Sequence, residues 1–239
     1  MDIRSKELAQ LICYPRFSEI EYNDRLAEME SLGVTSIMLG GMTTINGLHV
    51  AGKGQVGLVL RAKIGNKICA LKIRRVDANR KTMDDEVSLH RIANDAQVGP
   101  RLEAHTKDLI AMEFIDGLSI VDWVQSAGKT QLRDVAQSVL EQCYRLDNML
   151  LDHGELSRLN RHVIVSDRPY IIDFESASKI RKTSNVTAAA QSMFLYGAVA
   201  EIVHKTLQIN RENVLLALKI YKRSQTRTNF DAVLNSLQV

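Results

Sequence analysis

Two short stretches of the chain carry its most informative pattern. They are His153-Gly154-Glu155-Leu156-Ser157-Arg158-Leu159-Asn160 and Asp173-Phe174-Glu175. Between them, apolar runs at 163–165 and 170–172 flank a polar turn at 166–169, which predicts a short hairpin. The hairpin would bring Glu155, Asn160 and Asp173 toward one place. Their side chains all end in oxygen-bearing groups, which suit Mg²⁺, and Mg²⁺ in turn suits phosphates.

These stretches resemble the catalytic loop and the metal-binding triplet of the protein-kinase superfamily. In that family an Asp accepts the substrate hydroxyl proton, an Asn five residues later binds Mg²⁺, and the Asp of D-F-G binds Mg²⁺. The residue pattern of this loop is most similar to that of the small atypical RIO and Bud32 kinases, and Ser157 stands where RIO kinases have Ser. Two positions depart from the pattern: Glu155 replaces the base Asp, and Glu175 replaces the Gly. The resemblance implies catalytic roles for Glu155 and Asn160, and metal binding by Asn160 and Asp173.

A glycine-rich motif precedes these stretches. It reads Gly52-Lys53-Gly54-Gln55-Val56-Gly57, and alone it is weak support for any function. A Rossmann turn would require a helix next and an acidic residue about twenty positions on, but an apolar strand pattern follows and Lys72 stands there. A hairpin over phosphates fits better, because backbone amides approach closely where no Cβ intervenes. We therefore expect ATP contacts from Gly52, Lys53, Gly54, Gln55 and Gly57, with Val59 covering the adenine ring.

Lys72 lies in Ala70-Leu71-Lys72-Ile73, which resembles the V-A-I-K strand of kinases. Charged side chains are rarely placed between apolar strand residues unless they have a partner. The alternative is an edge lysine that points to solvent. The resemblance implies a partner on the helix expected at 82–97, where Glu86 is preferred to Asp85. This ion pair would hold Lys72 over the α- and β-phosphates, and Ala70 would also line the nucleotide site.

The segment Ala111-Met112-Glu113-Phe114-Ile115-Asp116-Gly117 resembles a kinase hinge. By that match Met112 would be the gatekeeper residue. The carbonyl of Glu113 and the amide of Ile115 would bond the adenine edge. Backbone groups make such bonds whatever the side chain, so this assignment depends on the position of the segment along the chain.

Other segments yield simpler expectations. Two helical pieces are expected within 1–32, broken at Pro15, with Ser18 and Glu21 as a capping box. A long helix should begin at a Thr130 cap, and a single helix should run from about 186 to 207, with two more beyond 212. Strands are expected at 36–39, 48–50, 56–62, 67–73, 101–104 and 108–114. His153 is expected to donate to backbone near Asp173 and not to act as a free base.

Length, net charge and cysteine content restrict the class of protein and its expected location. The chain has 239 residues, a net charge of +3, and no apolar run long enough for a membrane span, so we expect a cytoplasmic protein. Its three cysteines, odd in number and without metal-ligand spacing, indicate buried free thiols in a reducing compartment. A basic cluster near the end is either a solvated face or a polyanion contact; it comprises Lys219, Lys222, Arg223 and Arg227.

The resemblance covers about residues 47–200 and implies an α+β, bilobal, protein-kinase-like fold. The expected division is a helical extension at 1–46, an antiparallel first lobe with one helix at 47–115, and a reduced, mainly helical second lobe at 116–239. ATP would bind between the lobes with Mg²⁺. The expected function is phosphoryl transfer to Ser or Thr of a protein substrate, including the chain itself. Two rivals stay open: a small-molecule kinase of the aminoglycoside or choline type, and a pseudokinase scaffold for a partner protein.

Overall fold

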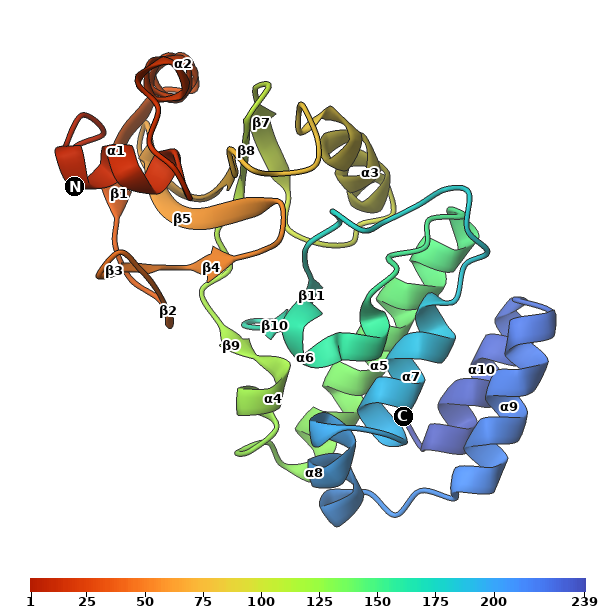
Figure 1. The fold of residues 1–239 in the computed structure, drawn as a ribbon. Helices are drawn as coiled ribbons and strands as arrows, with labels where there is room; N and C mark the ends of the chain where they lie inside the picture. Colours follow the sequence, from red (N-terminus) through yellow and green to blue (C-terminus); the bar gives the residue numbers. More distant parts are fainter. The chain divides into compact units, whose positions relative to one another are not determined.

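The computed structural model describes residues 1–239, and the chain divides into two compact units. Unit 1 comprises Met1–Ser88 and Pro100–Phe114, and unit 2 comprises Leu89–Gly99 and Ile115–Val239. The fold is α+β: unit 1 contains a twisted antiparallel sheet, and unit 2 is mainly helical (Figure 1). Helix α3 (Asp84–Asp95) contributes residues to both units.

The main sheet of unit 1 follows the order β1-β5-β6-β8-β7, with β4 paired to β5, and every pairing is antiparallel. The strands are β1 (Val34–Met38), β4 (Gly52–Lys53), β5 (Gly57–Ile64), β6 (Lys67–Arg74), β7 (Leu102–His105) and β8 (Leu109–Glu113). A separate hairpin joins β2 (Thr43–Ile45) to β3 (Leu48–Val50). The predicted strands are confirmed, whereas β2 and β4, three and two residues long, had no counterpart in the prediction.

The two faces of this sheet differ. One face is a continuous apolar core, in which Leu58, Leu60 and Leu71 pack with Leu8 and Leu11 of α1 (Lys6–Ile12). Fully burying one such leucine stabilises the fold by about 1.5–3 kcal/mol. Helix α2 (Glu19–Ser31) also belongs to unit 1, with Ser18 at its N-cap. The predicted capping box is wrong, because Ser18 makes no side-chain cap bond and Glu21 pairs with Arg25 at 2.7 Å instead.

The opposite face contains the lysine of the V-A-I-K-like strand. Register places Val59 opposite Lys72 on β5 and β6, and Ala70 opposite Met112 on β6 and β8. Directly paired residues project to the same face of a sheet, and residues two apart do so as well. Val59, Ala70, Lys72 and Met112 therefore share one face.

Unit 2 is organised around the long helix α5 (Lys129–Asn148), which packs against α7 (Asn185–Phe194). Two more helices, α9 (Arg211–Arg223) and α10 (Arg227–Leu237), lie side by side as an antiparallel pair (Figure 1). Short helix α4 (Ile120–Trp123) and the sheet β11-β10-β9 complete the unit. The strands of that sheet are β9 (Leu118–Ser119), β10 (Val163–Val165) and β11 (Pro169–Ile171), so the predicted hairpin is confirmed.

Asp147 joins three parts of unit 2. Its buried carboxylate accepts hydrogen bonds from the Tyr221 hydroxyl at 2.8 Å and from the Asn185 backbone and side-chain nitrogens at 3.0 and 2.8 Å. Burial raises the pKa of Asp147 despite these donors. The carboxylate sits at the start of α7, where the unpaired amides of a helix favour negative charge.

Two helix predictions in unit 2 are wrong in detail. The predicted cap of α5 at Thr130 is replaced by Gly128, whose amide donates to the Gln131 side chain at 2.9 Å. The single helix expected at 186–207 is two helices, α7 and α8 (Ala198–Thr206), separated at Gly197, where φ is +93°. That backbone conformation is open to glycine and ends a helix. No single helix has both the length and the apolar composition to cross a membrane, although α7 and α8, bent by 65°, meet the two criteria when counted together.

Candidate functional site

The charged pair predicted in unit 1 is present. Lys72 Nζ donates to Glu86 Oε1 at 2.7 Å, and the two side chains are 5% and 3% exposed. Arg80 lies farther from the same carboxylate, at 3.8 Å. The partner is therefore Glu86 and not Asp85, and the alternative of a solvent-pointing edge lysine is excluded. The contact of Lys72 with phosphates stays a prediction.

The glycine at position 57 leaves room for this lysine. A Cβ added there would lie 3.0 Å from both Lys72 Cγ and the Ile73 carbonyl oxygen. A larger residue would therefore fit only if the lysine stem or the β6 backbone moved by a few tenths of an ångström. By contrast, a Cβ at Gly52 would meet nothing closer than Val59 at 3.8 Å, so space alone does not demand a glycine there.

The predicted phosphate-binding loop is a hairpin between β4 and β5. Gly54 donates its amide to the Gly57 carbonyl at 2.8 Å, and Gln55 is exposed at the tip. Lys53 is directed to Tyr14, with 2.6 Å between its Nζ and the tyrosine hydroxyl oxygen. The hairpin is thus the one expected, while its contacts with a nucleotide stay a prediction.

Three of the remaining nucleotide-binding candidates of unit 1 lie on the same face of the sheet as Lys72. Val59 and Met112 are partly buried and Ala70 is buried, all on the face that carries Lys72. In the hinge-like segment, Glu113 ends β8 and Ile115 is the first residue of the following part of unit 2. The adenine contacts assigned to these two residues stay a prediction.

In unit 2 the catalytic-loop candidates surround the β10–β11 hairpin. Glu155 directly precedes the 3₁₀ turn η1 (Leu156–Arg158), Asn160 is exposed on α6 (Leu159–His162), and Asp173 follows β11. Asp173 has φ of +70°, which is uncommon for a residue other than glycine. The backbone around it must hold it in that conformation.

Two histidines fix the peptide that precedes Asp173. Ile172 donates its amide to the His162 carbonyl at 2.9 Å, and its own carbonyl lies 3.0 Å from His153 Nε2. The expected structural role of His153 is therefore confirmed. Burial, and after it the neighbouring His162, lowers the pKa of His153 to about 4, so its ring is neutral near pH 7 and Nε2 is the donor.

The structure adds a residue that the sequence reasoning missed. One ligand atom each from Glu155, His162 and Asp173 lies within 4.8 Å of the other two, and His162 Nε2 is 3.2 Å from Glu155 Oε2. A signal for His162 existed in the hairpin register. Because Val163 pairs with Ile171, the residue before β10 and the residues after β11 leave the ladder at the same end.

The predicted metal ligands are thus only partly brought together. Asp173 belongs to the convergent group, and Glu155, predicted as a base, joins it. Asn160 is an exposed residue of the helix that ends in His162. Its part in metal binding stays a prediction.

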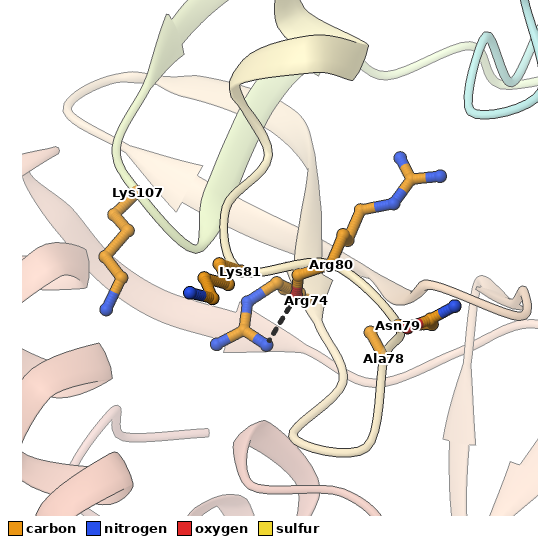
Figure 2. Close-up of a pocket in the computed structure, with 6 residues that line it drawn as sticks. All are labelled: Arg74, Ala78, Asn79, Arg80, Lys81 and Lys107. Atoms are coloured by element: carbon orange, nitrogen blue, oxygen red, sulfur yellow. Dashed lines mark hydrogen bonds between the residues drawn. The ribbon is translucent and has the colours of Figure 1, made fainter.

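A separate basic pocket of about 650 Å³ opens in unit 1. Its lining comprises Arg74, Ala78, Asn79, Arg80, Lys81 and Lys107, none of them a predicted site residue. Figure 2 shows Lys81 and Lys107 on one side of the pocket and Arg80 extending away from them. Arg74 is hydrogen-bonded to Asp108 at 2.5 Å, which raises its pKa. Because two of the four cationic side chains already face carboxylates, the pocket makes a weak case for an anion site.

Comparison with known proteins gives one relative and no family. No family model matches the chain. The chain is 29% identical over 112 residues to the uncharacterized protein MJ1211 of Methanocaldococcus jannaschii, a match that covers 97% of that protein and 47% of this chain. The similarity therefore adds no activity to the site.

Proposed function

We propose that this chain catalyses ATP- and Mg²⁺-dependent transfer of a phosphoryl group to Ser or Thr hydroxyls of a protein, including its own. In this proposal the fold is a reduced, bilobal relative of the RIO and Bud32 kinases, and most of the candidate nucleotide contacts are those of unit 1. The observation that carries the proposal is the buried Lys72–Glu86 pair above Gly57. No comparison with known proteins bears on it.

The charged pair supports the proposal because it is costly as a purely structural feature. Removing two charges from water costs several kcal/mol per ion, and well-packed apolar residues would be at least as stabilising. A cation held on the sheet beside a carboxylate is suited to bind phosphate oxygens. The apolar neighbours on the same face, Val59, Ala70 and Met112, are suited to cover an adenine ring.

The unit 2 candidates supply the other functions that phosphoryl transfer needs. Mg²⁺ prefers oxygen ligands, and the Asp173 carboxylate and the Asn160 side-chain oxygen fit that preference. When bound, Mg²⁺ would neutralise charge on the β- and γ-phosphates. Asp173 and Asn160 would hold the ion, and Glu155 would orient the acceptor hydroxyl and take its proton. Most of the rate enhancement would come from positioning and charge stabilisation.

A direct test is incubation of the purified chain with γ-labelled ATP and Mg²⁺, alone and with a generic basic protein, followed by identification of the labelled residues. We expect label on serine or threonine that requires Mg²⁺. A chain that binds ATP with Mg²⁺ but labels nothing, over a range of acceptors, would overturn the transferase assignment.

A second candidate function is a nucleotide-binding scaffold without turnover. The observation that favours it is the contact between Glu155 and His162 at 3.2 Å, which engages the carboxylate assigned to the acceptor hydroxyl. The replacement of Asp by Glu also moves the carboxylate by about one bond length, and a misplacement of about 1 Å can cost 10²-fold in rate. Under this alternative, ATP binding would survive while labelling would be absent.

A further inference from the structure

We infer that Glu155, His162 and Asp173 form a binding site for a divalent transition-metal ion of the Mn²⁺ or Zn²⁺ class, and that the chain binds this ion without nucleotide. The inference shares Glu155 and Asp173 with the proposed function but does not require phosphoryl transfer. It differs from the proposed Mg²⁺ site in its donors, because an imidazole takes part and Glu155 is a ligand.

The geometry of the three side chains suits a single ion. A metal with ligands at about 2.1 Å separates neighbouring donor atoms by about 3 Å and opposed ones by about 4.2 Å. The donor atoms of Glu155, His162 and Asp173 lie within 4.8 Å of one another, and the closest pair, Glu155 and His162, is 3.2 Å apart. Small side-chain rotations would therefore close the site.

The chemistry of the donors selects the class of metal. Two carboxylates and one imidazole suit Mn²⁺, Fe²⁺, Co²⁺ or Zn²⁺, whereas Mg²⁺ and Ca²⁺ prefer all-oxygen shells. Three protein ligands leave coordination positions for water or for a phosphate oxygen, as in catalytic metal sites.

The imidazole is positioned before any ion binds. The His162 side chain is 6% exposed and meets the His153 ring edge-on, with 5.2 Å between the ring centroids. His153 in turn is held by the Ile172 carbonyl and by Asn185, which accepts its backbone amide proton at 2.9 Å. The elements that orient His162 are the same ones that hold the peptide before Asp173.

The environment of the second ring nitrogen of His162 indicates how tightly the metal ion should bind. Its Nδ1 is buried and has no hydrogen-bond partner. Metal-bound histidines usually donate their other N–H to a partner, and losing such a partner typically costs about 10- to 100-fold in affinity. We therefore expect an ion that binds reversibly and is removed by EDTA, not a permanent structural metal.

The simplest alternative is a hydrogen bond between His162 and Glu155 with no metal. That bond involves two of the three residues, whereas the proposed metal site uses all three, including Asp173. The alternative predicts no metal affinity that depends on His162.

The test is metal titration of the full chain after EDTA treatment and dialysis, without nucleotide. Mn²⁺ binding is followed by electron paramagnetic resonance, and Co²⁺ by its visible spectrum, where thiolate bands would reveal binding at the cysteines. We expect one Mn²⁺ per chain, bound at least about tenfold tighter than Mg²⁺, and a Co²⁺ spectrum of nitrogen and oxygen donors without thiolate bands. Equal affinity for Mn²⁺ and Mg²⁺, or a thiolate spectrum, would overturn the inference.

The variant His162→Leu should weaken Mn²⁺ binding by about 100-fold or more, since it removes a ligand and not only an outer partner. The matched control is His204→Leu in α8, whose ring contacts the Phe194 carbonyl; it should bind Mn²⁺ as the wild type does. Because His162 is buried, the partly exposed Glu155→Gln provides a second variant that keeps the fold and should also weaken Mn²⁺ binding. Wild-type affinity in either site variant would overturn the inference.

The two proposals fail in distinguishable ways. Mn²⁺ binding that depends on His162, in a chain that labels no acceptor, would leave the metal site standing and remove the kinase assignment. Labelling with Mg²⁺ that is unchanged in His162→Leu, together with no Mn²⁺ binding, would do the reverse.

Discussion

The Lys72–Glu86 pair of unit 1 joins an ammonium to a carboxylate at 2.7 Å, whereas the cluster of unit 2 gathers two carboxylates around one imidazole. The pair is balanced in charge and nearly fully buried. The cluster is partly exposed at Glu155 and Asp173, and its own three members carry more negative charge than one imidazolium would balance. The first group joins opposite charges, with Arg80 also 3.8 Å from the Glu86 carboxylate, whereas the second presents two carboxylates and an imidazole, a set of donors suited to a cation.

The largest effect should follow from breaking the balanced pair. Lys72→Met should reduce phosphoryl transfer by several orders of magnitude and lower the free energy of unfolding by about 3–5 kcal/mol, because it leaves Glu86 charged in a buried place. The double variant Lys72→Met/Glu86→Gln should recover much of that stability and stay inactive. Urea unfolding and labelling assays on both variants measure the two effects. Activity in the folded double variant would sink the assignment of Lys72 to the phosphates.

The next effect concerns the carboxylate that both proposals use. If Glu155 acts on the acceptor hydroxyl, Glu155→Gln should reduce turnover at saturating Mg-ATP by orders of magnitude with little change in nucleotide affinity. Glu155→Asp should also reduce turnover, because a loop shaped for Glu leaves Asp short. Measured rates for wild type and both variants decide the matter: equal rates for wild type and Glu155→Gln would favour the scaffold alternative.

Asp173 should control how nucleotide affinity depends on Mg²⁺. Wild-type chain should gain about 2.7 kcal/mol of stability from Mg-ATP at 100 times its dissociation constant, and much less from ATP with EDTA. Asp173→Asn should remove the difference between the two conditions. Asp167→Asn, in the exposed turn of the same hairpin, is the matched control and should keep it. Thermal unfolding measures the stabilisation by ATP under the two conditions. If ATP stabilises the wild type equally with EDTA and with Mg²⁺, the assignment of Asp173 as a metal ligand is wrong.

The smallest effect should come from one methyl group beneath Lys72. Gly57→Ala places a Cβ 3.0 Å from the Lys72 stem and the Ile73 carbonyl, so it should displace the lysine, weaken ATP binding several-fold and cost about 1–3 kcal/mol of stability. Gly52→Ala meets only ordinary contacts and should keep stability within about 0.5 kcal/mol of the wild type. Calorimetric titration with ATP measures the affinity of the Gly57→Ala and Gly52→Ala variants. Equal affinity in the two variants would show that the position of the Lys72 stem does not affect ATP binding.

Several features follow from local pattern alone. The β10–β11 hairpin, the strands β5 and β6, and the helices α9 and α10 lie where alternation, turn residues and helical spacing predict them. These predictions succeed because their causes act over a few residues or across one strand pairing. The Lys72–Glu86 pair was also predicted, but the apolar neighbours of Lys72 indicate only that it has a partner, and the choice of Glu86 came from the resemblance to kinases.

Other features depend on contacts between distant residues. The break at Gly197 is invisible in an apolar periodic stretch until the backbone adopts a positive φ there. Ser18 loses Glu21 as a capping partner because Glu21 pairs with Arg25 four residues later, and Arg25 is buried against the Arg74 carbonyl and Asp108. The spacing allows both the capping box and the Glu21–Arg25 pair, and the distant partners of Arg25 favour the second.

The amino-acid sequence was sufficient to predict the α+β class, most of the helices and strands, and the acidic residues before and after the β10–β11 hairpin. The proximity of His162 to Glu155 and Asp173, and the close approach of Lys72 to Gly57, depend on the tertiary structure. The physical reason is that both facts concern distances between side chains on different segments. Spacing along a chain predicts which face a residue occupies, but an approach of 3 Å is determined when the segments pack.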